Sequence, residues 1–302
     1  MELTLQHLRL LREVARQSTI TAAADTLGYT RSAVSQQLMG LERATGVQVL
    51  ERVGRNVRLT DAGRVLVDNA EEILSKVESA QAALEAAAGG VQGVLEIGIY
   101  ESIAVPLLAP LVETMRSTYP GLRIRSREVE PDSALEALVV GDLDLAFNLT
   151  YPHDRAQQLP AIVRTPIVDE RFVAVFPAGS ARSAPIDLRD LGEEEFISPP
   201  PTSGCGRAIV AACREAGFEP DIVHQIDNYP TTLNLVAAGC GVALIPEFSV
   251  PHRSDLEVCD LLVPVSRTID ISHRRSSAER PAIQATLAAL KEIQCGEARL
   301  AV

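Results

Sequence analysis

The sequence has no long apolar run, and this absence excludes a membrane-spanning helix. No stretch approaches the roughly 18 consecutive apolar residues that a bilayer span needs. The amino-terminal segment has the pattern of a charged amphipathic helix, which is unlike a signal peptide. We therefore expect a cytoplasmic protein with no membrane partner.

Cysteine is scarce, and its spacing fits neither a zinc site nor a disulfide framework. Five cysteines are an odd number, and no Cys-x-x-Cys pair occurs among them. Cys205 opens a predicted helix, where the pKa of a thiol can be lowered, and Cys213 lies eight residues farther on. In one helix they would be about 12 Å apart, beyond disulfide reach. We interpret both as structural.

Enzyme motifs are also missing. The sequence contains no G-x-S-x-G elbow, no phosphate loop and no H-E-x-x-H, and its five histidines are scattered. Gly239-Cys240-Gly241 has the look of a dinucleotide turn but precedes a predicted strand instead of following one. We expect no enzyme activity, no cofactor and no bound metal.

Positive charge is confined to one end of the chain. The net charge is −12, yet residues 1–60 carry eight Arg against five acidic residues, a balance of +3 that leaves −15 for the remainder. A basic head on an acidic body suits a protein whose head alone contacts phosphate. The 302 residues are enough for two or three hydrophobic cores, so we expect several domains.

Residues 19–58 have the pattern of a helix-turn-helix. Thr21 can N-cap a short helix that ends at Gly28, and Thr30 can cap a second helix that runs to about Ala44. A first helix with Leu8, Leu11, Val14 and Ala15 at helical spacing would complete a three-helix core. In the second helix, three residues share the buried face: Val34, Leu38 and Leu41.

The other face of this second helix is polar and suits the major groove of DNA. The groove is about 12 Å wide and admits a helix whose Arg pairs with guanine and whose Gln pairs with adenine. Beyond Gly46, the segment LERVGRNVRLT predicts a basic wing with a turn at Gly54 and Asn56. A surface bundle with solvated charges is the alternative. The candidate DNA-binding residues are Thr21, Thr30, Arg31, Ser32, Ser35, Gln36, Arg52, Arg55 and Arg58, with Met39 on the same stripe.

A long helix follows from Thr60 and Asp61 to Gly89. Its apolar residues alternate by four and three positions, which is the 3.5-residue repeat of a coiled-coil seam. About 28 residues rise about 40 Å, too long for the head alone to shelter, so a partner helix is expected. A helix packed on its own body is the alternative. The candidate dimerisation residues are Leu66, Ala70, Ile73, Val77, Ala80 and Leu84, followed by Ala87.

After Gly93, strands and helices alternate, which is typical of a parallel α/β sheet. The final helix, Arg280 to Ile293, has no sheet of its own left to cover, so we expect the chain to return to its first α/β unit. The expected elements are strands 94–99, 122–127, 144–148, 172–176, 196–197, 222–225 and 242–245, and helices 105–118, 133–140, 206–216 and 231–238.

A small molecule would bind beyond the carboxyl ends of these strands, where helix N-termini attract anions. Amides and hydroxyls there could hold a carboxylate, and the nearby acids favour a zwitterion or an amine; the alternative is that the glutamates are merely solvated. The candidate effector-binding residues are Tyr100, Glu101, Ser102, Glu128, Glu130, Asn148, Pro201, Thr202, Ser203 and Asn228, flanked by Pro200, Gly204 and Asp227.

The segment AAADTLGYTRSAVSQQLMGLERATGVQVLERVGRNVRLTDAG resembles the amino-terminal signature of the LysR-type transcriptional regulators. The resemblance continues through GVLEIGI, YPGLRI, GDLDLAF and VAAGCGVALIPE. Arg31 stands where many members carry Gln, and Gln36 where many carry Arg, so base preference should differ. Leu50 replaces a frequent Phe, which should change packing only.

The resemblance implies a winged helix-turn-helix head (1–60), a coiled-coil linker helix (61–90) and an effector domain (91–302) similar to periplasmic solute-binding proteins. Lobe I would comprise 91–165 and 268–302, lobe II 166–267, with crossovers near 163–167 and 265–269. It favours a tetramer built from two kinds of dimer contact.

We interpret the protein as an effector-responsive transcription factor. Its expected partners are a double-stranded DNA operator, a small-molecule effector and further copies of itself in a homodimer or homotetramer, with RNA polymerase a further candidate. The alternative is an α/β solute-binding or enzymatic protein with a helical extension, and binding to its own upstream DNA would separate the two.

Overall fold

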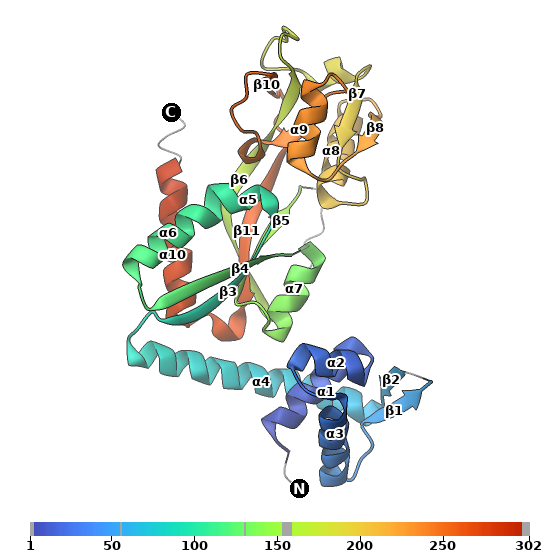
Figure 1. Cartoon of the computed structure of the whole chain (residues 1–302), viewed down its shortest axis with the longest axis vertical. Helices are drawn as coiled ribbons and strands as arrows, with labels where there is room; N and C mark the ends of the chain where they lie inside the picture. Colours follow the sequence, from blue (N-terminus) through green and yellow to red (C-terminus); the bar gives the residue numbers. More distant parts are fainter. Residues whose placement is uncertain (1–2, 55, 130, 153–158, 298–302) are drawn as a thin grey trace. The chain divides into compact units, whose positions relative to one another are not determined.

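The computed structural model describes residues 3–54, 56–129, 131–152 and 159–297 (Figure 1). The chain divides into two compact units, residues 1–88 and residues 89–302, and each is described by itself. Within the described ranges, no helix has both the length and the apolar composition that crossing a membrane requires.

Three capped helices begin the amino-terminal unit. They are α1 (Leu5–Gln17), α2 (Ile20–Leu27) and α3 (Arg31–Thr45). Gly28 and Gly46 end α2 and α3 in the left-handed conformation, which glycine adopts without strain. The predicted caps at Gly28 and Thr30 are confirmed.

The predicted N-cap at Thr21 is wrong. Thr19 has the extended backbone of an N-cap, and its hydroxyl accepts a hydrogen bond from the Ala22 N–H. Thr21 is therefore the second residue of α2, and its side chain is exposed. Both threonines precede an alanine-rich run, so either could have supplied the hydroxyl. The left-handed Ser18, which ends α1, fixes the start two residues earlier than predicted.

A small apolar core joins the three helices. Val34, Leu38 and Leu41 are buried on one face of α3, as the spacing predicts, and Leu11 and Val14 of α1 pack against them. A two-stranded antiparallel hairpin follows: β1 (Leu50–Val53) and β2 (Asn56–Leu59), with Gly54 at positive φ in the turn. The chain therefore contains the predicted wing.

The helix α4 (Asp61–Ala88) has the predicted length and start. The Thr60 hydroxyl accepts from the Gly63 N–H, and Gly89 follows with positive φ. A Cβ on Gly63 would lie 2.1 Å from the Val49 carbonyl oxygen, so only glycine lets α4 begin this close to the wing.

Seven strands form the sheet of the carboxyl-terminal unit, in the order β10-β6-β11-β5-β3-β4, with β9 paired to β6. The predicted parallel arrangement holds for β3 with β4 and β5, whereas β6 pairs antiparallel with β9, β10 and β11. The strands are β3 (Gly93–Ile99), β4 (Leu122–Glu128), β5 (Leu145–Thr150), β6 (Ile162–Pro177), β9 (Ala243–Pro246), β10 (Leu256–Asp260) and β11 (Ser266–Arg274).

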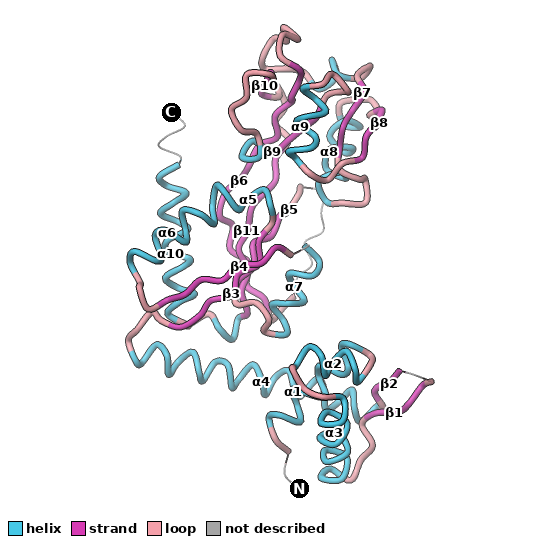
Figure 2. The backbone as a smooth tube through the Cα atoms, in the orientation of Figure 1, coloured by secondary structure: helices cyan, strands magenta, loops and turns pink. Residues whose placement is uncertain are grey.

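The sheet carries two lobes, joined by β6 and β11 (Figure 2). In the first lobe, α6 (Ala109–Thr118) and α10 (Pro281–Glu297) cover one face, and α7 (Pro131–Val140) covers the other. The last helix thus returns to the first lobe, as expected. In the second lobe, β6 is buried on both faces, which explains its unbroken apolar run FVAVF.

The second lobe adds a parallel pair, β7 (Glu195–Ser198) and β8 (Asp221–Gln225), and the helices α8 (Gly204–Glu215) and α9 (Tyr229–Ala237). Short 3-10 turns complete the unit: η2 (Leu188–Leu191), η3 (Glu247–Ser249) and η4 (Arg275–Ser277). Strand β10 was not among the predicted elements.

The first helix of this unit begins earlier than predicted. Instead of starting at Val105, it begins with α5 (Glu101–Ile103) and passes through a π-helical turn, η1 (Ala104–Leu108), into α6. Pro106 and Pro110 lack the N–H that a regular α-helix would use there, which accounts for the wider turn.

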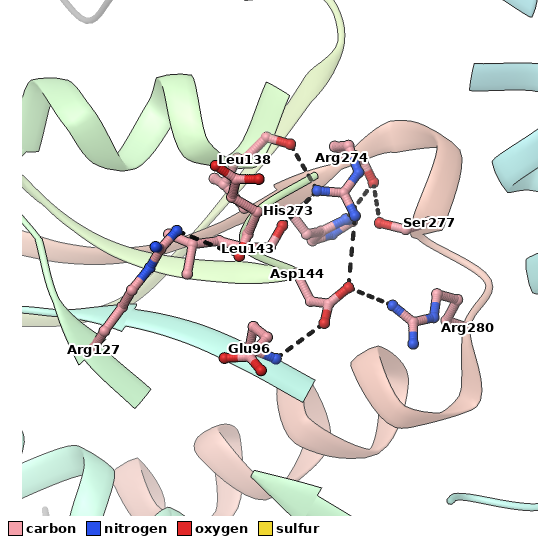
Figure 3. Close-up of polar contacts among 10 residues, drawn as sticks. Glu96, Arg127, Leu138, Leu143, Asp144, His273, Arg274, Ser277 and Arg280 are labelled. Atoms are coloured by element: carbon pink, nitrogen blue, oxygen red, sulfur yellow. Dashed lines mark hydrogen bonds and ion pairs between the residues drawn. The ribbon is translucent and has the colours of Figure 1, made fainter. Parts of the chain in front are cut away.

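A buried polar network holds the start of β5 in the first lobe (Figure 3). One oxygen of Asp144 accepts from the Glu96 N–H at 3.0 Å, and the other pairs with the guanidinium groups of Arg274 and Arg280. Arg274 also donates to the carbonyl oxygens of Leu138 and Leu143. One carboxylate, directly before β5, is therefore bonded to β3, to the end of β11 and to the residue that precedes α10.

Candidate functional site

The candidate DNA-reading face of α3 lies on the surface of the amino-terminal unit. Arg31, Ser32, Gln36 and Met39 are exposed and Ser35 is half-buried, opposite the buried face of the same helix. Thr30 N-caps α3, and its hydroxyl accepts from the Ala33 N–H. The polar stripe that the sequence predicts is thus available to a groove.

The wing presents the next candidates. Arg52 on β1 and Arg58 on β2 are exposed, and Arg58 lies opposite Glu51 in the strand register. Arg55 lies outside the described residues. Two of the three predicted wing arginines therefore stand on a solvent-facing hairpin.

The seam residues of α4 do not share one environment. Ala70 is buried against Leu8 of α1, and Leu66 packs at the same place. Ile73 and Leu84 are exposed apolar side chains, Ala80 is exposed and Val77 is half-buried. The head thus covers the first two seam positions, in part as the alternative foresaw, and the remainder of the stripe stays on the surface of this unit.

The first contact between the lobes at the candidate effector site joins Glu101 to Asn228. The Asn228 side chain caps α9, because its Oδ1 accepts from the Thr231 N–H and hydroxyl. Its Nδ2 is thereby turned toward the Glu101 carboxylate, at 3.3 Å from Oε2. A first-lobe carboxylate therefore already occupies an amide donor of the second lobe.

The next candidate, Ser102, is hydrogen-bonded to a buried ion pair between Arg267 and Glu170. The Arg267 Nε lies 2.7 Å from Glu170 Oε2, and both side chains are at most 1 % exposed. The other Glu170 oxygen accepts from the Phe248 N–H, while Arg267 Nη2 donates to the Ser102 hydroxyl at 3.0 Å. The buried charges next to the candidate site therefore pair with each other inside the protein.

Two tyrosines and a thiol lie near the Arg267 side chain. Cys205 Sγ lies 3.7 Å from Tyr229 Oη, and Arg267 interacts electrostatically with both of them and with Tyr151. Burial raises the pKa of Cys205, and it raises the pKa of Cys213 to about 12. Both cysteines lie in α8, eight residues and thus about 12 Å apart. These features fit structural thiols rather than a reactive pair.

Several predicted effector residues are engaged inside the protein. The Ser203 hydroxyl donates to the Pro200 carbonyl and accepts from the Gly206 N–H, which makes it the N-cap of α8 and uses both of its roles. The Asn148 amide is buried in the sheet and donates to Ser272 Oγ and the Ala146 carbonyl. Tyr100 is buried as well. The Ser203 hydroxyl and the Asn148 amide are thus engaged inside the protein.

The other predicted residues stay at the surface. Glu128 ends β4 in register with Ile99, exposed, and Thr202 is exposed with its carbonyl accepting from Arg207. Glu130 lies outside the described residues. Pro201 lines a pocket of about 310 Å³ along α8, together with Tyr151, Gly204, Arg207, Val210 and Arg214. This pocket adjoins the predicted site but does not reach Ser102.

Sequence reasoning missed Arg267 and Glu170. The usable signal was a charged residue in or just after each predicted crossover: Arg267 lies within 265–269, and Glu170 lies three residues after 163–167, directly before the apolar run FVAVF. Charged residues inside crossing strands are rarely buried unless they are paired. Across the described ranges, no group of three His, Cys, Asp or Glu side chains could hold a metal ion.

Comparison with known proteins gives two family matches. Residues 5–64 match the model of the bacterial regulatory helix-turn-helix protein, lysR family, and residues 88–294 match the LysR substrate binding domain.

Individual relatives extend over most of the chain. The HTH-type transcriptional regulator BenM of Acinetobacter baylyi is 30 % identical over 248 residues, 80 % of each protein. A cysteine mutant of OxyR from Corynebacterium glutamicum aligns in space with a TM-score of 0.61 and 26 % identity, covering 100 % of this chain and 94 % of that one. Full-length CbnR, complexed with its target DNA, shares the fold at a TM-score of 0.57 and 21 % identity over 97 % and 100 %.

Proposed function

The chain belongs to the LysR family of DNA-binding transcriptional regulators with an effector-binding domain, and from this premise we propose how its parts divide the work. Residues 1–60 bind an operator, residues 61–90 form the linker helix of a homodimer, and residues 91–302 bind a small molecule between two lobes, I (91–165 and 268–302) and II (166–267). The observation that supports this proposal most directly is the exposed polar stripe of α3, a helix that begins at the N-cap Thr30.

The DNA-binding proposal gives the residues of the head two roles. Arg31, Ser32, Ser35 and Gln36 enter the major groove, where side chains on one helix face can reach base edges. Arg52 and Arg58 of the wing contact phosphate or the minor groove, and Arg55 belongs to the same proposal by sequence. Two heads in a dimer or tetramer would address half-sites a whole number of helical turns apart, and RNA polymerase is the candidate partner for the bound complex.

Alanine substitutions at Arg31 and Arg52 should weaken DNA binding in different ways. Arg31→Ala is expected to cost about 1 to 3 kcal/mol on the operator and to relax one base position. Arg52→Ala should weaken all sequences alike and reduce the salt slope by about one, because it removes one phosphate contact. Gel shifts at several salt concentrations measure both, with the exposed Arg189→Ala as the control. Equal salt slopes and unchanged base preference in both variants would contradict these roles.

The effector proposal rests on the groups that meet between the lobes. Ser102 follows the end of β3, Thr202 follows the end of β7, and Glu101 adds an exposed carboxylate. Hydroxyl and amide donors suit a ligand carboxylate, whereas Glu101 suits a ligand ammonium group. We therefore assign the effector to the carboxylate-bearing metabolites, with amino acids and amines favoured by Glu101.

Removal of either hydroxyl should weaken effector binding. Ser102→Ala and Thr202→Ala are each expected to remove a hydrogen bond to a charged group, about 1.5 to 3 kcal/mol of binding free energy. A thermal-shift screen of amino acids, amines and organic acids measures this, with Ser117→Ala on the exposed face of α6 as the matched control. If the best hit is neutral and apolar, or binds both variants as it binds the parent protein, the site is misassigned.

A further inference from the structure

Arg267 and Glu170 face each other because of the strand register. β6 and β11 run antiparallel along most of their length, and Arg267 is the direct partner of Glu170 in that ladder. Directly opposed residues point to the same face with their Cβ atoms about 5 Å apart, close enough for a short ion pair. The pair is therefore built into the two strands that join the lobes.

The ion pair reaches the first lobe through one hydroxyl. Arg267 Nη2 donates to Ser102 Oγ at 3.0 Å, and Ser102 lies in α5, at the end of β3. On the opposite side, Glu170 accepts from the Phe248 N–H at 2.9 Å. Burial raises the pKa of Glu170, and Arg267 and the Phe248 N–H oppose that rise. A continuous chain of hydrogen bonds thus runs from η3 through both strands to Ser102.

This hydrogen-bond chain leaves the Ser102 hydroxyl its role as a donor. A serine hydroxyl has one O–H donor and two acceptor lone pairs, whereas a guanidinium group can only donate. Arg267 consequently fills an acceptor position of Ser102 and cannot receive its proton. Among the described residues, Arg267 is the partner that the structure gives this hydroxyl. The Ser102 proton must therefore point to an acceptor outside the ion pair.

We propose that Arg267 is a positioning residue for the effector, which fixes the Ser102 hydroxyl as a hydrogen-bond donor to a ligand carboxylate. The inference rests on the proposed effector site. Arg267 does not touch the ligand, since its side chain is 1 % exposed and its charge is met by Glu170. Selection for a carboxylate then comes from the direction of one O–H group.

The proposal makes the effects of Ser102 and Arg267 depend on each other. Acetate, glycine and methylamine serve as probes of matched size, and their binding to the full chain is followed by ligand-observed NMR titration. Ser102→Ala should weaken the binding of acetate and glycine about tenfold and change the binding of methylamine little. The paired variant Arg267→Met with Glu170→Met removes both buried charges together and should cause a similar loss. In the triple variant, the loss should equal that of Ser102→Ala alone, because residues that act through one group are not additive.

The controls separate this proposal from a merely structural role. Arg171 and Glu247 form a comparable ion pair beside it, with both side chains about half exposed, so Arg171→Met with Glu247→Met should leave the three probes unchanged. Arg267→Lys keeps the charge but replaces the planar fork by one ammonium group, and should weaken acetate several-fold even if the paired methionine variant does not fold.

The outcomes are distinguishable. If Ser102→Ala leaves acetate and glycine unchanged, the proposed effector site is overturned and the inference with it. If Ser102→Ala weakens them but the Arg267 variants do not, or if the losses add in the triple variant, the site stands and the positioning role of Arg267 is overturned.

Discussion

Asp144→Ala is expected to lower the free energy of unfolding of the carboxyl-terminal unit by about 3 kcal/mol, because it removes one partner of a buried ion cluster. The Asp144, Arg274 and Arg280 side chains are only 14 %, 11 % and 18 % exposed. Without the carboxylate, the guanidinium groups of Arg274 and Arg280 each lose this ion pair, and the Glu96 N–H loses its acceptor. Water can replace these contacts only in part, since the three side chains are mostly buried.

Urea unfolding of the full chain measures this loss, with the transition of the carboxyl-terminal unit followed by hydrogen exchange of β3 and β5. Asp142→Ala is the matched control, because that aspartate lies two residues away and is exposed. Surface substitutions of this kind usually change stability by less than about 0.5 kcal/mol. A shift of the Asp144 variant no larger than that of the Asp142 variant would show that the network does not hold the lobe.

The sequence predicted local structure well where one short signal decides it. Apolar spacing located α3, α4 and most strands, and the glycines after α2, α3 and α4 marked their ends. The predicted N-cap at Thr21 failed because Thr19 also precedes the alanine-rich run and directly follows the left-handed Ser18 that ends α1. The early start of the helix at Glu101 was missed because Pro106 reads as a start, whereas the chain accommodates it in a wider turn.

The candidate site was predictable only in outline. The strand-end rule selected segments that meet in the structure, as Glu101 and Asn228 do, but it says nothing about which side chains are already bonded inside the protein. Asn148 belongs to a sheet contact with Ser272, 124 residues away, and the ion pair of Glu170 and Arg267 spans 97 residues. Such pairs depend on the antiparallel register of two strands, which no local spacing reveals.

The seam of α4 illustrates the same limit at a surface. A four-and-three repeat cannot tell which apolar residues meet a partner and which meet the chain's own head. The structure packs Leu66 and Ala70 near Leu8 and leaves Ile73 and Leu84 exposed, the latter at 71 %. An exposed leucine on a long helix, in line with Ile73 and Val77, still favours a partner helix. The dimer seam that we propose therefore begins after Ala70.

Val77→Glu is expected to separate the linker dimer. The substitution places a carboxylate in an apolar seam, where the partner chain brings an identical charge, and neither can be paired there. Loss of the dimer also uncouples the two reading heads, so the second half-site no longer benefits from a high local concentration. We expect operator affinity to fall by about a hundredfold or more, while each head keeps its weak binding to a single half-site.

Sedimentation and gel shifts on one and two half-sites measure this effect, and Ser75→Glu is the control. Ser75 lies two residues before Val77 on the opposite side of the heptad and is exposed, so the same new charge should stay in solvent there. The Ser75 variant should sediment and bind like the parent protein. An unchanged oligomer and unchanged two-site affinity for Val77→Glu would refute the seam, and the dimer would then have to be held by the carboxyl-terminal units alone.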